Sequence, residues 1–158
     1  MRNAYFIFLL ILSATSCQED VENNSFQVAG IWHQDAGIIE GSNLSYRNKL
    51  EFDLDGTYEA SLQVVETENV QNVIGYMSLT KGEYQIDDNT LKRFDIEQYG
   101  LDGENQYLNR DKLLLEEFIT SLPEIGVKLD ETGDILTLIF PCGEEDSCVP
   151  LQTYKRSK

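Results

Sequence analysis

The chain has 158 residues, of which 28 are acidic and 12 are basic, so its formal net charge is −16. This length supports a single domain with a hydrophobic core of its own. The acidic excess argues against nucleic acid and anionic membrane surfaces as partners, because both carry negative charge.

The N-terminus has the pattern of an export signal. Arg2 is the positive flank, and the apolar stretch at residues 4–12 is too short to span a bilayer. The stretch ends in Ala-Thr-Ser-Cys, which resembles a bacterial lipobox. That resemblance implies a signal peptide at residues 1–16 and a lipid anchor on Cys17 after cleavage. An ordinary signal peptide followed by a free thiol is the alternative.

Residues 17–25 separate the predicted anchor from the folded domain at residues 26–158. The Gln-Glu-Asp that follows Cys17 is similar to the export signal of Bacteroidota surface lipoproteins. It implies the bacterial outer membrane, with display on its outer side. The rest of the segment is polar and lacks a pattern, so we expect a flexible tether that reaches on the order of 16 Å.

The first predicted strand, residues 26–35, contains Gly30 and Trp32. Gly-x-Trp at this place resembles the lipocalins, and more closely the lipocalin-like domains of bacterial envelope lipoproteins. The resemblance implies that Trp32 closes one end of a barrel and stacks on a basic side chain of the last strand. That side chain would be Arg156, with Lys155 as the alternative. A core tryptophan of another β fold also fits.

A hairpin is predicted around the stretch LEFDLDGTYEASLQVVE at residues 50–66. Apolar residues occupy the even positions on both sides of the turn, a period of two that indicates strands with one buried face. A three-residue loop at residues 54–56 pairs Phe52 with Tyr58 and Leu50 with Ala60, which puts all of them on one face. Gly56 suits the left-handed position of such a loop.

The same stretch contains FDLDGT, which is similar to the first motif of haloacid-dehalogenase phosphatases. That family would use Asp53 as nucleophile and Asp55 for the leaving-group proton, with Lys81 and the acidic pair at residues 87–88 as later motifs. Its parallel sheet needs crossovers of a dozen or more residues. Here the motif runs directly into an amphipathic strand, so the spacing favours the hairpin.

Further strands follow in chain order, with one helix between them. Alternation and turn residues predict strands at residues 43–53, 57–66, 73–80, 82–86, 90–96, 125–129, 135–139 and 149–155. A bulge at Gly82 would join two of them. Helical spacing is found in five apolar residues: Leu114, Leu115, Phe118, Ile119 and Leu122. They predict a helix that begins at a cap of Asn109 or Asp111 and ends at Pro123.

The hairpin at residues 125–139 has a turn at residues 130–133. The rule used for the first hairpin pairs Leu129 with Ile135 and Val127 with Thr137. The second of its strands is apolar on both faces, so we expect other parts of the protein to cover both faces of this strand.

Two cysteines remain near the C-terminus. Cys142 ends one strand and Cys148 begins the next, and an even pair in an oxidising compartment predicts a disulfide. Such a disulfide across a short loop adds roughly 2–3 kcal/mol to the free energy of unfolding. A metal or redox site is the alternative, but it lacks a CxxC motif and a nearby histidine.

Catalytic and metal sites are not expected. His33 is the only histidine and should face outward beside Trp32. The acidic loops at residues 102–105 and 144–146 offer oxygen ligands for Ca²⁺ but lack EF-hand spacing, so we expect them to be solvated. No catalytic residue, no metal and no cofactor is therefore assigned, and we expect no enzyme.

The elements together predict an all-β fold: one antiparallel, lipocalin-like barrel of about eight strands with one short helix. We expect a small apolar ligand inside it. The residues that would line this cavity are Phe52, Tyr58, Ala60 and Leu62. The alternative is a filled barrel that docks an envelope or glycan-handling protein, and an interior volume below about 300 Å³ would favour it. The aromatic contacts for either function would come from Tyr46, Tyr76, Tyr84 and Tyr99.

Overall fold

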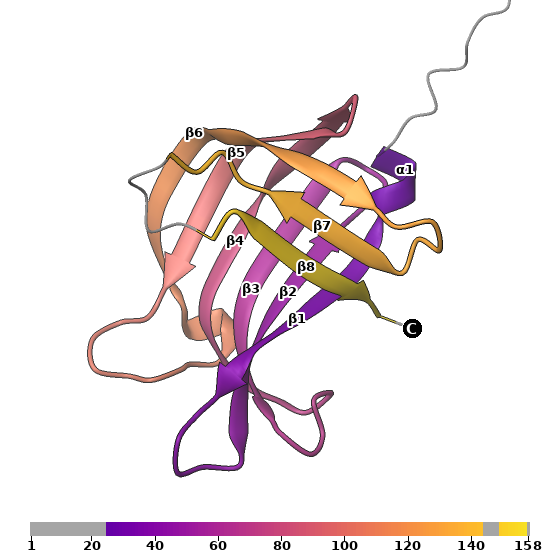
Figure 1. The fold of residues 1–158 in the computed structure, drawn as a ribbon. Coiled ribbons are helices and arrows are strands. Elements are labelled where there is room, and N and C mark those ends of the chain that lie inside the picture. The colour runs from indigo at the N-terminus through magenta and orange to yellow at the C-terminus, as the bar shows by residue number, and fades with distance from the viewer. Residues whose placement is uncertain (1–24, 144–148, 158) are drawn as a thin grey trace, which may run out of the picture.

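The protein folds into one closed barrel of eight antiparallel strands, which follow one another around the barrel in chain order (Figure 1). The computed structural model describes residues 25–143 and 149–157. The strands are β1 (Gly30–Ile38), β2 (Leu44–Phe52), β3 (Thr57–Glu66), β4 (Val73–Asp87), β5 (Thr90–Gly100), β6 (Leu114–Leu129), β7 (Ile135–Ile139) and β8 (Leu151–Arg156). A short helix α1 (Ser25–Val28) precedes β1, and a 3₁₀ turn η1 (Arg110–Lys112) precedes β6. The predicted antiparallel β-barrel is confirmed.

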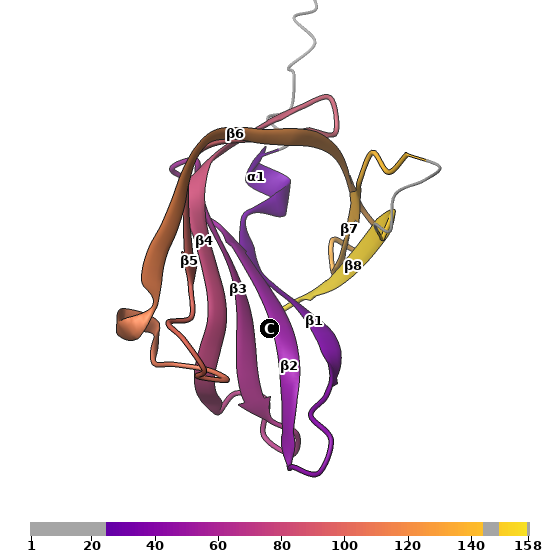
Figure 2. The ribbon, with the colours of Figure 1, turned by 90° about the vertical axis from the view of Figure 1, so that its left-hand side faces the viewer.

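The two ends of the barrel differ. α1 lies at the end where β1 begins, and β6 arches over it (Figure 2). β7 and β8 are short and flank only this half, whereas β2–β5 continue beyond them toward the far end. β7 pairs with β6 only over Gly126–Leu129. Within the described residues, the corresponding edge of β6 at positions 114–125 therefore has no strand partner, and the far half of the barrel is open there.

The hairpin of β2 and β3 has the predicted register. Phe52 pairs with Tyr58 and Leu50 with Ala60. The amide of Asp53 donates to the carbonyl of Thr57 at 2.9 Å, and Gly56 has a φ of 89°. Local alternation and turn chemistry were sufficient here, because one buried face allows only one register.

The core fills the half of the barrel next to α1. Its buried members come from every strand and from α1: Val28, Trp32, Leu50, Phe52, Tyr58, Tyr84, Ile86, Leu91, Ile125, Val127, Leu136, Leu138 and Tyr154. The ring of Phe52 meets that of Tyr84 edge-on, with centroids 4.9 Å apart. The inward side chains of eight short strands fill a barrel of this size.

The predicted helix at residues 114–122 is wrong, since these residues form the first part of β6. Two irregularities against β5 place extra residues in β6, one around Pro123 and one at Glu116. The bulge around Pro123 places the inward residues Leu122 and Ile125 three residues apart. Ile119 pairs with Ile96, which lies three residues from Arg93 because of the extra residue at Asp95 of β5. That spacing imitates one face of a helix, and Pro123 is tolerated because it sits at a bulge.

The register predicted for β6 and β7 is also wrong. Val127 pairs with Leu138, and Leu129 with Leu136, one residue away from the expected pairs. The turn is longer than expected, because the amide of Asp130 donates to the carbonyl of Ile135 at 3.0 Å. Ile139 consequently faces outward and is 43% exposed, so β7 is not covered on both faces. Apolar residues on both faces of β7, with Thr137 as the single polar residue, left the sequence without a clear signal for its register.

β4 runs unbroken through Gly82, where a bulge was expected. The extra residue lies in the opposite strand, at Asp95 of β5, which has a φ of 51°. A Cβ on Gly82 would lie 2.9 Å from the carbonyl oxygen of Phe94 and 3.0 Å from the ring of Tyr58. Glycine is therefore required at this position by close approach.

Candidate functional site

Trp32 and Arg156 close the barrel at the α1 end. The two residues face each other across β1 and β8, and the guanidinium carbon of Arg156 lies 4.1 Å from the centroid of the Trp32 ring. Trp32 is fully buried, and its indole N–H donates to the carbonyl of Val28 at 2.8 Å. The guanidinium of Arg156 donates to the carbonyls of Gln27, Ala29 and Gly133.

Gly30 makes room for this contact, because a Cβ at that position would lie 2.9 Å from a guanidinium nitrogen of Arg156. The structure thus brings together Gly30, Trp32 and Arg156, while Lys155 pairs with His33 one residue away.

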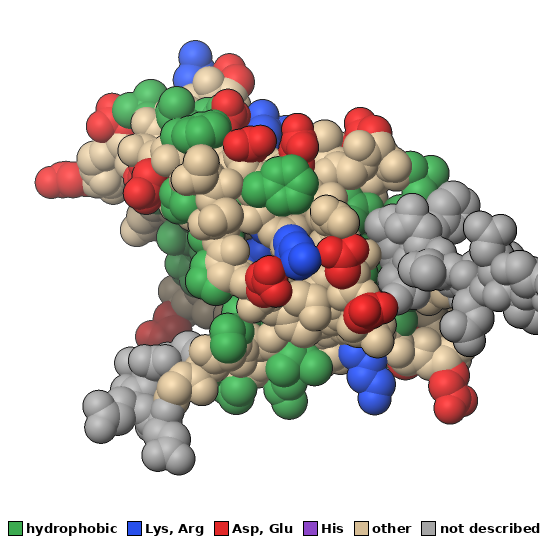
Figure 3. Space-filling view, turned by 90° about the horizontal axis from the view of Figure 1, so that it is seen from above, with side chains coloured by type: hydrophobic (Ala, Val, Ile, Leu, Met, Phe, Trp, Pro, Cys, Tyr) green, Lys and Arg blue, Asp and Glu red, His purple; other side chains and the backbone are tan. Residues whose placement is uncertain are grey.

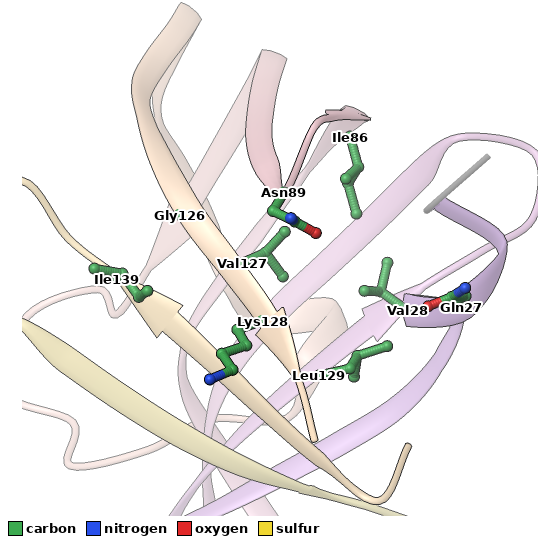
Figure 4. Close-up of a pocket in the computed structure, with 9 residues that line it drawn as sticks. All are labelled: Gln27, Val28, Ile86, Asn89, Gly126, Val127, Lys128, Leu129 and Ile139. Atoms are coloured by element: carbon green, nitrogen blue, oxygen red, sulfur yellow. The ribbon is translucent and has the colours of Figure 1, made fainter. Parts of the chain in front are cut away.

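A pocket of about 450 Å³ lies beside this closed end, between α1, the β4–β5 turn and β6. The side chains of Val28, Ile86, Val127 and Leu129 face a common space there (Figure 4). Gln27, Asn89 and Lys128 add polar groups to its lining. An apolar lining with a few polar groups is the usual character of a small-molecule site.

The sequence did not identify this pocket. α1 was read as part of the first strand, so Val28 had no expected position at a barrel end. Asp88 and Asn89, both with positive φ, form the turn between β4 and β5. The signal available was the alternation of Val127 and Leu129, which continues the inner face of β6 to the end of the strand.

The four residues expected to line a ligand cavity occupy two different environments. Phe52 and Tyr58 are 3% and 4% exposed and belong to the packed core. Ala60 and Leu62 line a cavity of about 130 Å³ in the barrel wall, together with Leu50, Thr80 and Tyr154. This volume is below the range in which small-molecule sites enclose a whole ligand.

A polar cluster lies under the core, where the open half of the barrel begins. Arg93 projects inward from β5, since it pairs with Tyr84 of the core on one side and with Leu122 on the other. Its Nε and the hydroxyl of Tyr58 are buried atoms without a hydrogen-bond partner among the described residues. Burial lowers the pKa of Arg93, and a weaker electrostatic interaction with the Tyr58 and Tyr154 hydroxyls acts in the opposite direction.

The two tyrosines are affected in the same way. Burial raises the pKa of Tyr154 to about 12 and raises that of Tyr58, while the positive charge of Arg93 lowers both. No sequence pattern predicts that these residues lie together, because they come from strands β3, β5 and β8.

His33 lies outward, as alternation predicted, between strands that carry cations. Burial is the main cause that lowers the pKa of His33, and the charges of Arg47 and Lys49 add to the effect.

Within residues 25–143 and 149–157, no group of three or more His, Cys, Asp or Glu side chains is placed to hold a metal ion. Asn105 donates to the carbonyl of Asp102 in the acidic loop.

Acidic residues exceed basic ones in this chain, 28 to 12. Seen from above, acidic side chains outnumber basic ones over the α1 end of the molecule (Figure 3).

Arg47 and Gln63 point outward from the barrel but are buried. The guanidinium of Arg47 donates to the Gln63 side chain at 2.8 Å and to the carbonyl of Val70. Lys81 lies 5.4 Å from the ring centroid of Tyr99.

The phosphatase-like motif lies on the turn of the β2–β3 hairpin. Asp53 is exposed, and its carbonyl accepts hydrogen bonds from Gly56 and from the Tyr84 hydroxyl. The carboxylate of Asp55 accepts hydrogen bonds from both the amide and the hydroxyl of Thr57, which lower its pKa. The chain forms an antiparallel barrel here, without the parallel sheet that the phosphatase reading needs.

Some of the predicted features lie outside the described residues: the signal segment, Cys17, Cys148 and the acidic loop at residues 144–146. The lipid anchor and the Cys142–Cys148 disulfide therefore stay predictions. No helix in the described part of the chain is long and apolar enough to cross a membrane. No protein-family model, curated protein or solved structure matches the chain.

Proposed function

We propose that the protein is a lipid-anchored, non-enzymatic binding protein of the bacterial outer membrane, with a lipocalin-like barrel that holds a small apolar ligand. The observation that supports this most directly is the pocket of about 450 Å³ at the α1 end, floored by Val28, Ile86, Val127 and Leu129. Its volume falls in the range of small-ligand sites, and the volume of the pocket at Ala60 and Leu62 does not. The ligand site is therefore proposed at the barrel end.

The position of the pocket agrees with an anchor on Cys17. Ser25, the first residue of α1, follows Cys17 by eight positions, and α1 contributes Gln27 and Val28 to the pocket. A flexible tether of that length reaches on the order of 16 Å. An acylated protein would thus hold the pocket close to the membrane from which an apolar ligand would come.

A fluorescence titration with the apolar dye N-phenyl-1-naphthylamine tests this function. Leu129→Trp places a large side chain in the pocket from a half-buried position, and it should weaken dye binding by roughly tenfold or more. The matched control is Thr120→Trp, at an exposed position on the same strand outside the pocket. Equal binding by the two variants, or no binding by the wild type, would contradict the proposed site.

A filled barrel that docks an envelope protein is the second candidate. It is favoured by the small volume of the pocket at Ala60 and Leu62, about 130 Å³, and by three exposed apolar side chains on β6. Leu114, Leu115 and Phe118 are 52%, 56% and 61% exposed. The dye titration separates the two functions, since a docking protein would bind no dye at the α1 end.

A further inference from the structure

We infer that the interior of the barrel contains a second site, distinct from the α1-end pocket, in which Arg93 and Tyr58 bind the carboxylate of an aliphatic acid. The acid would enter from the open half of the barrel and place its chain along the apolar inner wall. This site does not depend on the α1-end pocket, and the two can be tested separately.

The first reason is the unpaired hydrogen-bonding capacity of the cluster. Tyr58 is 4% exposed, yet its hydroxyl has no partner among the described residues, and the same holds for the buried Nε of Arg93. The guanidinium makes one long hydrogen bond, from Nη2 to the carbonyl of Pro123 at 3.4 Å. Buried donors are normally satisfied, and each one left without a partner costs about 1–3 kcal/mol.

The second reason is charge. Within the described residues no carboxylate forms an ion pair with Arg93, although the chain has 28 acidic residues, and the ion pairs found there involve Lys49, Lys92, Arg110 and Lys112. A partly buried cation without an anion is costly to the fold. A guanidinium presents its donors in a planar fork that matches a carboxylate, and a neighbouring tyrosine hydroxyl can donate to the same group.

Arg47 shows what a structural arginine looks like in this barrel. It is also buried, but its guanidinium donates to Gln63 and to the carbonyl of Val70. Arg93 lacks such a set of partners, so a purely structural role does not explain it. A residue that breaks a local rule without compensation marks a functional position in many proteins.

The third reason is the space beside the cluster. Tyr154 interacts electrostatically with Arg93 and also lines the cavity of about 130 Å³, with Leu50, Ala60 and Leu62. This volume equals roughly four water molecules, enough for a carboxylate and its first methylene groups. Tyr58 stands next to Ala60 on the same inner face of β3, so its position borders the cavity.

The rest of an aliphatic chain would lie along the open half. Ile119 and Leu122 of β6 point inward, because they pair with Ile96 and Arg93. Both are only partly buried, since no described strand covers the free edge of β6 in that half. These side chains give an apolar wall that continues from Arg93 toward the far end. The expected ligand class is therefore a monocarboxylic acid with a short to medium alkyl chain.

Isothermal titration calorimetry with sodium octanoate tests the inference, with octan-1-ol as the neutral analogue and sodium chloride as the simple anion. We expect octanoate to bind at least tenfold more tightly than octanol. Arg93→Met should abolish this preference, and Tyr58→Phe should weaken octanoate binding severalfold. Lys92→Met is the matched control, because Lys92 is the next residue on β5 and pairs outward with Asp87; it should bind octanoate as the wild type does.

Free stability gives an independent readout. Without ligand, Arg93→Met should be at least as stable as the wild type, whereas Arg47→Met should be clearly less stable. Octanoate should raise the melting temperature of the wild type and leave that of Arg93→Met unchanged. If Arg93→Met does not fold, Tyr58→Phe carries the test alone.

Three results would overturn the inference. Octanoate and octanol that bind equally would show that no carboxylate is recognised. Chloride that protects the wild type as well as octanoate does would show a simple anion site. Octanoate binding lost in Leu129→Trp but kept in Arg93→Met would place the acid in the α1-end pocket, which would leave the proposed function standing without the interior site.

Discussion

The guanidinium of Arg156 lies over the ring of Trp32, with its central carbon 4.1 Å from the ring centroid, although the two residues stand at opposite ends of the folded domain's sequence. Arg156 also donates to three backbone carbonyls, two of them in or next to α1. This contact joins the first strand, the last strand and α1, so it closes the barrel.

Removal of either partner should destabilise the protein. Trp32→Ala should cost about 3–5 kcal/mol, because it empties a fully buried site. Arg156→Ala should cost roughly 2–3 kcal/mol through the lost ring contact and lost hydrogen bonds. In urea unfolding followed by circular dichroism, the double variant should show a coupling on the order of 1 kcal/mol. Strictly additive costs would contradict a direct contact.

The control for this experiment has to be chosen from the structure. Gln63 is an outward residue, but it is 2% exposed and bonded to Arg47, so its substitution is not neutral. Thr120→Ala, at an exposed position of β6, should change the free energy of unfolding by less than about 0.5 kcal/mol.

Stability should fall at alkaline pH because of Tyr154. Its folded-state pKa of about 12 lies above the ordinary value of 10, so the folded protein holds this proton more tightly than the unfolded chain does. The contribution is complete below pH 10 and is lost as pH rises from 10 to 12, with a total on the order of 2–3 kcal/mol. Urea midpoints measured from pH 9 to pH 12 should show this decline, and Tyr154→Phe should reduce its slope.

A core substitution that keeps all the tyrosines distinguishes this effect from general destabilisation. Leu138→Val should lower the midpoint by a similar amount at every pH and retain the wild-type slope. An unchanged slope in Tyr154→Phe would mean that another group controls the alkaline transition.

Cys17→Ser should release the protein from the membrane fraction. An acyl anchor contributes ~0.8 kcal/mol per buried CH₂, and more than one chain is needed for stable binding. Fractionation of cells that express each variant checks this, and Cys142→Ser should stay membrane-bound as the control. A Cys17→Ser protein that still sediments with the membrane, or a wild type free in the periplasm, would refute the anchor.

Asp53→Asn should leave any measurable activity unchanged and should alter the fold only slightly. The hairpin uses the backbone of Asp53, and the carboxylate that accepts turn hydrogen bonds is that of Asp55. Purified protein should therefore hydrolyse p-nitrophenyl phosphate with Mg²⁺ no faster than buffer does. A turnover that disappears in Asp53→Asn would establish the phosphatase instead.

The sequence was most informative where neighbours in the chain decide the structure. Alternation and the glycine of the turn fixed the register of Phe52 with Tyr58, because one buried face excludes a one-residue slip. It failed for β6, where the bulge around Pro123 and the bulge at Asp95 of the neighbouring β5 leave Ile119, Leu122 and Ile125 three residues apart, which imitates a helix. A short apolar stripe cannot separate these two structures, since both bury the same residues.

What the sequence by itself determined is the all-β class, the single domain, the β2–β3 hairpin and the acidic surface, because each depends on composition or on residues close together in the chain. Tertiary structure alone decided which half of the barrel is filled and where pockets remain, since those depend on the unequal lengths of β2–β5 and of β7–β8. It alone also brought Tyr58, Arg93 and Tyr154 together. Three strands distant in sequence meet inside a barrel only when it closes, and no local pattern records which of their inward side chains will face one another.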